Sequence, residues 1–273
     1  MRQSQILNLC ILAIILLSLP SCQKVIQVDL NSVDPRLVIE ANISDQPGPY
    51  IVKLSRTVNF DEDNIFPAVT AARIIISSNT GQLDTLSETS AGIYKTHSLQ
   101  GVPGTTYNLS VLAGENTYQS TGAMNLPVDI DTLIVQNTTG GPGSGGPGAG
   151  GKNKQVKVLF KDPAGFVNFY RLVMKVNDSV LNSIQVTTDQ FRDGENFTVT
   201  MRMEKSEIHP GDSVRVYLQN IDKKMYDYFR ALSSEGGPMQ QSGTPSNPPN
   251  NLTGGALGYF NVYAITSKAI KVP

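Results

Sequence analysis

The chain is a succession of short β-like segments separated by glycine, proline, asparagine and aspartate. Residues 107–111 alternate apolar and polar side chains, as expected of a strand with one buried face. Turn signals recur about every 8–12 residues, the spacing typical of a β-sandwich. We therefore predict a β-sandwich over residues 33–125. Its expected strands are residues 36–43, 50–56, 72–77, 82–86, 106–112 and 117–121.

A second set of such segments fills residues 126–273, interrupted by one helix. Met225, Phe229 and Leu232 are spaced i, i+4 and i+7, which places them on one face of a helix over about 223–234. Asp222 is a suitable N-cap, and the glycines at 236–237 end the helix. We predict a second β-sandwich or open barrel with this helix packed on it. Its expected strands are residues 132–136, 155–161, 169–176, 183–188, 197–203, 213–221 and 258–266.

The first residues are predicted to be a targeting segment. Arg2 precedes an apolar run over 9–19, which is shorter than the about 20 residues needed to span a bilayer and matches the core of a signal peptide. Residues 19–22 (Leu-Pro-Ser-Cys) resemble the lipobox of bacterial lipoproteins, which implies a signal peptide over 1–21 and a lipid on Cys22. Residues 22–32 would then be a lipidated tether. The alternative is an ordinary secretory peptide that happens to contain a cysteine.

Composition excludes several classes of protein. The 273 residues include 22 Lys and Arg against 23 Asp and Glu, so the chain lacks the basic surface that nucleic acids require. Cys10 is removed with the signal peptide and Cys22 carries the lipid, which leaves no thiol for catalysis or disulfides. We therefore expect no nucleic-acid partner and no redox chemistry.

Motifs for catalysis, nucleotides and metals are incomplete. Residues 146–152 have the spacing of a phosphate-binding loop, but Asn153 stands where a Ser or Thr is needed. His97 and His209 are isolated, and the acidic run at 61–64 lacks the spacing of an EF-hand. Asp189 and Asp193 are close in sequence without forming a recognisable acid–base pair. We predict no catalytic residue, no metal, no nucleotide and no cofactor.

Glycine and proline are concentrated in residues 140–151. This segment is predicted to be a flexible loop between two strands of the second block. An interdomain linker is the alternative.

The long loop over 235–258 is the candidate binding segment. Loops longer than about 12–15 residues are often functional. Asn247, Asn250, Asn251 and Tyr259 are the residues we predict to contact a partner or a sugar. Alternatively, the glycines at 254, 255 and 258 simply allow close packing.

The first block resembles transthyretin-like and immunoglobulin-like modules of bacterial surface proteins. The similar pieces are residues 67–69, 71–76, 92–94 and 101–109. The resemblance implies a spacer or a docking surface.

The whole chain resembles the domain-of-unknown-function 4249 family of Bacteroidota lipoproteins. The segments that carry the resemblance are residues 162–165, 189–194, 216–221 with 226–229, 247–251 and 254–260. The resemblance implies a two-part, mostly β envelope lipoprotein, often associated with outer-membrane transporters. It supplies no catalytic residues.

The expected function is therefore that of a non-enzymatic binding or adaptor module, lipid-anchored in the outer membrane and accessory to a nutrient transporter, with a glycan or peptide as ligand. A structural or adhesive envelope protein is the alternative, and a carboxylate-based hydrolase is a less favoured one. The sequence leaves open whether the protein faces the periplasm or the cell surface.

Four triplets, at 84–86, 131–133, 178–180 and 212–214, resemble the O-glycosylation pattern of Bacteroidota, and modification there is left open.

Overall fold

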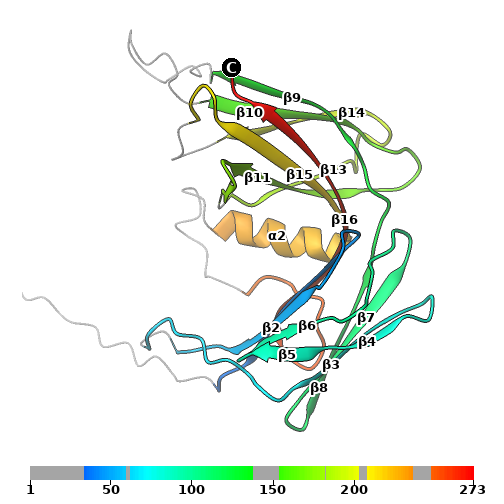
Figure 1. Ribbon diagram of the computed structural model, residues 1–273. Coiled ribbons are helices and arrows are strands. Elements are labelled where there is room, and N and C mark those ends of the chain that lie inside the picture. The colour runs from blue at the N-terminus through cyan, green and yellow to red at the C-terminus, as the bar shows by residue number, and fades with distance from the viewer. Residues whose placement is uncertain (1–33, 60–61, 138–153, 182, 203–207, 236–246) are drawn as a thin grey trace, which may run out of the picture. The chain divides into compact units, whose positions relative to one another are not determined.

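The computed structural model describes residues 34–59, 62–137, 154–181, 183–202, 208–235 and 247–273. The predicted signal peptide, Cys22 and tether, and the glycine-rich segment 140–151, lie outside these residues. Residues 35–273 form one compact unit (Figure 1). No helix among the described residues combines the length and apolar character needed to cross a bilayer.

A nine-stranded sheet runs through this unit. Its strands follow the order β12-β11-β15-β16-β1-β2-β6-β5, and β13 also pairs with β11. Their bounds are β1 (Leu37–Ser44), β2 (Ile51–Arg56), β5 (Ser87–Ser90), β6 (Ile93–Lys95), β11 (Phe169–Val176), β12 (Ser179–Val180), β13 (Gln185–Thr188), β15 (Ser213–Ile221) and β16 (Leu257–Lys271).

Two smaller sheets complete the β structure. One has the order β4-β3-β7-β8 and the other the order β14-β10-β9. Their bounds are β3 (Arg73–Ser78), β4 (Leu83–Thr85), β7 (Thr106–Ala113), β8 (Asn116–Ala123), β9 (Ile130–Asn137), β10 (Lys154–Lys161) and β14 (Asn196–Arg202). The predicted mostly β, sandwich-like fold with one helix is confirmed.

Two apolar cores lie along one face of the nine-stranded sheet. In the first, Ile39 and Phe260 pack with Ile74 and Leu109 of the four-stranded sheet. In the second, side chains of β11 and β15 such as Leu172 pack with those of the three-stranded sheet. The alternation of side chains along a strand directs one face of the sheet to these cores, because every second side chain of β1, β11 and β15 is buried.

The last strand, β16, contributes to both parts of the sheet. It is parallel to β1 through its first half and antiparallel to β15 through its second half. Phe260, Val262 and Ala264 are buried in the first core, although they come from the predicted second block. The strand is also longer than the predicted 258–266. The division into domains 33–125 and 126–273 stays a prediction.

Glycine is required where β16 approaches β1. Gly258 has a φ of +95°, and a Cβ built there would lie 2.1 Å from the carbonyl oxygen of Ile39. A side chain is therefore excluded by both the backbone conformation and the neighbouring strand. This supports the alternative in which a glycine of the 235–258 loop serves packing.

The helix α2 (Lys223–Glu235) begins as predicted. The Oδ1 atom of Asp222 accepts a hydrogen bond from the backbone N–H of Met225 at 2.8 Å, which is N-cap geometry. Met225 and Phe229 are buried with Ile221 in a third apolar cluster. Because Ile221, Phe169 and Tyr263 point away from the two cores, α2 lies on the opposite face of the nine-stranded sheet (Figure 1).

The strands on either side of the glycine-rich segment are neighbours. β9 and β10 pair antiparallel from Asn137 and Lys154 to Ile130 and Phe160. The segment thus connects two adjacent strands of one sheet. The prediction that residues 140–151 are flexible concerns residues that the structure does not describe.

Candidate functional site

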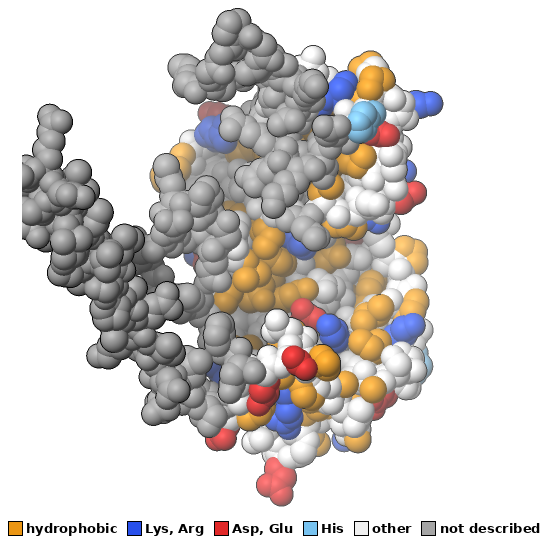
Figure 2. Space-filling model, turned by 90° about the vertical axis from the view of Figure 1, so that its left-hand side faces the viewer, with side chains coloured by type: hydrophobic (Ala, Val, Ile, Leu, Met, Phe, Trp, Pro, Cys, Tyr) orange, Lys and Arg blue, Asp and Glu red, His pale blue; other side chains and the backbone are white. Residues whose placement is uncertain are grey.

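Aromatic and polar side chains gather where α2 meets the nine-stranded sheet. Alternation on β11 and β16 directs Arg171, Tyr259 and Tyr263 to the face opposite the cores, and α2 brings Tyr228 and Phe229 to the same face. We call these five residues the tyrosine face. The view from the side of α2 shows hydrophobic side chains gathered near the middle of the molecule, with charged side chains beside them (Figure 2).

Three rings of the tyrosine face contact one another, those of Tyr228, Phe229 and Tyr259. Tyr259 lies 5.3 Å from Tyr228 and 5.8 Å from Phe229, measured between ring centroids. Phe229 is buried, whereas Tyr228, Tyr259 and Tyr263 are partly exposed. Rings fixed by mutual contact and still open to solvent are suited to bind the flat face of a ligand.

Arg171 is the charged member of this face. Its guanidinium carbon lies 4.1 Å from the centroid of the Phe229 ring, and Nη1 donates to Oε1 of Gln219 at 3.3 Å. Its Nε is buried without an acceptor, and no carboxylate among the described residues forms an ion pair with it. Arginine is seldom buried without an anion, so this guanidinium has spare capacity to bind one.

Burial sets the protonation of these groups. Burial lowers the pKa of Arg171, and the neighbouring Tyr259 and Tyr263 act in the opposite direction. Burial raises the pKa of Tyr228 to about 12 and also raises that of Tyr263. The phenols of Tyr228 and Tyr263 therefore stay protonated at neutral pH and can donate hydrogen bonds.

A polar strip adjoins Tyr259 on the same face. The parallel register places Asn42 beside Asn261. Asn42 donates to the Tyr259 hydroxyl at 3.5 Å, and Asn261 donates to Oδ1 of Asn42 at 3.4 Å. The Oδ1 atom of Asn261 is buried without a donor. The strip thus adds a second unpaired polar atom beneath this surface.

The four predicted contact residues separate in the structure. Tyr259 belongs to the tyrosine face. Asn251 is buried and pairs with both the N–H and the carbonyl of Phe260, at 3.0 and 2.7 Å, and Asn250 donates to the carbonyl of Ala256 at 3.0 Å. Asn247 is exposed. The contacts of Asn250 and Asn251 are those of structural residues, and ligand binding by any of the four stays a prediction.

Sequence reasoning missed Arg171 and Tyr263. Both lie at positions of β11 and β16 that alternate with buried ones, a signal present in the sequence. Their importance depends on α2, which packs on this face and could not be placed from the pattern alone.

Other predicted features have ordinary surroundings. His97 Nδ1 lies 3.1 Å from Oδ1 of Asp84, and His209 donates its backbone N–H to Asp212. Each of the four glycosylation-like triplets has an exposed hydroxyl residue; these are Thr85, Thr132, Ser179 and Ser213.

The fold and the face together define a mostly β protein whose single described helix and nine-stranded sheet form an aromatic surface. A sequence profile of the family described as "Domain of unknown function (DUF4249)" matches residues 23–269. The chain belongs to this family.

Similarity to solved structures is weak. A DUF4785 family protein from Legionella pneumophila is 12% identical with a TM-score of 0.24, over 68% of this chain and 52% of that one. The adhesin InvE of Yersinia pseudotuberculosis is 17% identical with a TM-score of 0.21, over 67% of this chain and 55% of that one. The matched region is thus about half of either solved chain. No curated protein shows significant similarity.

Proposed function

We propose that the protein is a non-enzymatic binding module of the cell envelope, anchored through a lipid on Cys22, and that its ligand binds at the tyrosine face. The anchor is supported by the lipobox-like sequence at 19–22. The binding role is supported by Arg171, a partly buried cation without an acidic partner among the described residues.

The chemistry of the face defines the class of ligand. A partly exposed guanidinium without an acidic partner among the described residues binds a carboxylate or a similar oxygen anion, while the partly exposed rings of Tyr228 and Tyr259 bind a flat apolar surface. An acidic glycan or a peptide with a free carboxylate presents both groups. Delivery of such a ligand to an outer-membrane transporter is the adaptor role that we propose.

Crosslinked co-purification from native membranes tests this function. The tagged protein is expected to recover a defined transporter or ligand, and Arg171→Met is expected to reduce that recovery at least tenfold. Arg171→Lys keeps the charge but loses the planar fork, so it is expected to restore only part of the binding. Recovery of free lipoprotein alone from the wild type would contradict the proposal.

Arg215→Met is the matched control. Arg215 lies on β15, is exposed, and is on the same face of the sheet as Arg171. Its replacement by Met causes the same change in net charge as Arg171→Met. Both variants should unfold within a few degrees of the wild type. Equal loss of binding in the two variants would indicate a general effect of charge and would contradict a site at Arg171.

A further inference from the structure

Two turns outside the tyrosine face are fastened to each other by carboxylates. One turn follows β10 and contains Asp162 and Gly165, and the other follows β13 and contains Asp189, Asp193 and Gly194. The N–H of Gly165 donates to both oxygens of Asp193, at 2.9 and 3.0 Å. In return, the N–H of Gly194 donates to Oδ2 of Asp162 at 3.0 Å.

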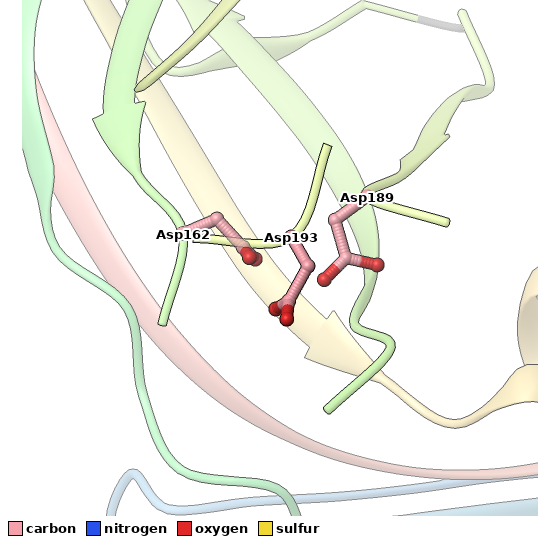
Figure 3. Close-up of side chains that lie close together, drawn as sticks. All are labelled: Asp162, Asp189 and Asp193. Atoms are coloured by element: carbon pink, nitrogen blue, oxygen red, sulfur yellow. The ribbon is translucent and has the colours of Figure 1, made fainter. Parts of the chain in front are cut away.

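These connections bring three carboxylates together. Asp162, Asp189 and Asp193 each offer an oxygen, and these three oxygens lie within 4.8 Å of one another. The side chains converge on a common point between the two turns (Figure 3). We call them the carboxylate cluster. Asp162 and Asp189 are fully buried, whereas Asp193 is exposed.

Asp189 carries an oxygen without a partner. Its Oδ1 accepts the N–H of Asn168 at 2.8 Å, but its Oδ2 is buried and receives no hydrogen bond. The side chain is 0% exposed and is directed at the other two carboxylates (Figure 3). A buried carboxylate oxygen that lacks a donor is costly, so it indicates a missing partner, either a cation or a proton.

The protein itself supplies no such partner among the described residues. No lysine, arginine or histidine there forms an ion pair with any of the three carboxylates. Arg192 is adjacent in sequence, but its guanidinium carbon lies 4.4 Å from the centroid of the Phe197 ring. The Tyr170 hydroxyl donates a hydrogen bond to Oδ1 of Asp162, but no cation of the described residues balances the negative charge of the cluster.

We propose that the carboxylate cluster binds a calcium ion, which fastens the β10–β11 turn to the β13–β14 turn. Calcium takes hard oxygen ligands and tolerates irregular geometry, as three aspartates from two turns would provide. Asp193, being exposed, gives the ion a path from solvent, and water completes the coordination. The sequence predicted no metal here because Asp162 lies 27 residues before Asp189, and only the fold brings them together.

A shared proton is the competing explanation. Burial raises the pKa of Asp189, and the neighbouring Asp162 adds to this effect, while the N–H of Asn168 opposes it. Asp162 and Asp189 would then form a hydrogen-bonded acid pair that needs no metal. The two explanations differ in their response to calcium and to neutralisation of Asp189.

Calcium titration of the chelator-treated full-length protein is the first test. In the wild type, millimolar calcium is expected to raise the unfolding midpoint by about 5 °C, the shift typical of a ligand well above its dissociation constant. Asp193→Asn, at an exposed position, is expected to lose most of this shift. Asp131→Asn removes a carboxylate that is also exposed but lies outside the cluster, and this variant should keep the shift. No shift in the wild type, or an equal shift in all three proteins, would overturn the proposal.

Asp189→Asn gives the second test, because the difference in unfolding temperature between this variant and the wild type is expected to change sign when calcium is added. In chelator, this variant is expected to be at least as stable as the wild type, because it removes a buried charge. In calcium it is expected to unfold at a lower temperature than the wild type, because a ligand is lost. An offset between the two proteins that is the same with and without calcium would show that the cluster is only an acid pair.

Discussion

The guanidinium carbon of Arg171 lies 4.1 Å from the centroid of the Phe229 ring, which joins strand β11 to helix α2 through a cation–π contact. Such contacts contribute about 0.5–2 kcal/mol, depending on how far the cation is removed from water. The contact orients the charge of Arg171 beside the tyrosines. The helix is thus part of the candidate site as well as part of the fold.

Removal of the Phe229 ring is expected to loosen α2. Phe229 is 4% exposed and lies in the cluster that fixes the helix to the sheet. We expect Phe229→Ala to lower the free energy of unfolding by about 3–4 kcal/mol, and to weaken ligand binding at Arg171. Urea unfolding measures the first effect. Leu232→Ala, at a partly buried position of the same helix, serves as the control and should cost clearly less.

Asp84 is expected to make stability depend on pH. Burial alone would raise the pKa of Asp84, but the backbone N–H groups of Ser98, Leu99 and His97 and the His97 ring together lower it. A pKa that is lower in the folded state stabilises the protein above the unfolded pKa of about 3.9, and this stabilisation is lost as the pH falls through the folded value.

Asp84→Asn tests that dependence. The variant is expected to be less stable than the wild type by roughly 2 kcal/mol at pH 7, because a buried charged acceptor of three N–H groups is lost. The difference should shrink toward pH 3. Denaturant unfolding at both pH values measures it, and a constant difference would contradict the explanation. Asp131→Asn, at an exposed site, should change little at either pH.

Gly258→Ala is expected to disturb the junction of β1 and β16. The added methyl would meet the Ile39 carbonyl oxygen, and the backbone would keep an unfavourable positive φ. We expect a loss of at least about 2 kcal/mol from the combined strain and close contact. Gly255→Ala is a control with a similarly positive φ but no atom near the added methyl. The difference between the two variants in thermal unfolding isolates the steric part.

A fragment of residues 34–125 is expected not to fold by itself. Its core would lack four buried residues that come from the end of the chain, namely Ala256, Phe260, Val262 and Ala264. The edge of β1 would also lose its parallel partner. Circular dichroism and proton NMR should show an unfolded or poorly packed chain. A cooperatively folding fragment would instead support the predicted independent domain over 33–125.

The strands and the helix were accessible from the sequence because their signals are local. The alternation at 107–111 and the spacing of Met225, Phe229 and Leu232 each involve neighbouring residues, and the structure places a strand and a helix there. The short strands β5 and β12 were missed, since all residues of Ser87–Ser90 and Ser179–Val180 are exposed and show no alternation of burial.

The candidate site was only partly accessible. Tyr259 was identified as an aromatic residue beside a long loop, but its neighbours Arg171 and Tyr228 come from distant segments. The continuation of β16 to Lys271 was not foreseen, because its pairing with β15 decides it and residues 267–271 (Ser-Lys-Ala-Ile-Lys) show no alternation of apolar and polar side chains. Pairings across the sheet have no local signal of this kind.

The parallel pairing of β1 with β16 has a consequence for how the chain acquires its structure. Asn42 and Asn261 are neighbours across these strands, although 219 residues separate them. A chain that emerges with its N-terminus first must hold β1 unpaired on this side until almost all of the remaining residues have followed. Contacts of such long range make folding slow, and an exposed strand edge invites aggregation in the meantime. We therefore expect nascent or incomplete chains to depend on a chaperone, and to become independent of it only once Leu257–Lys271 is available.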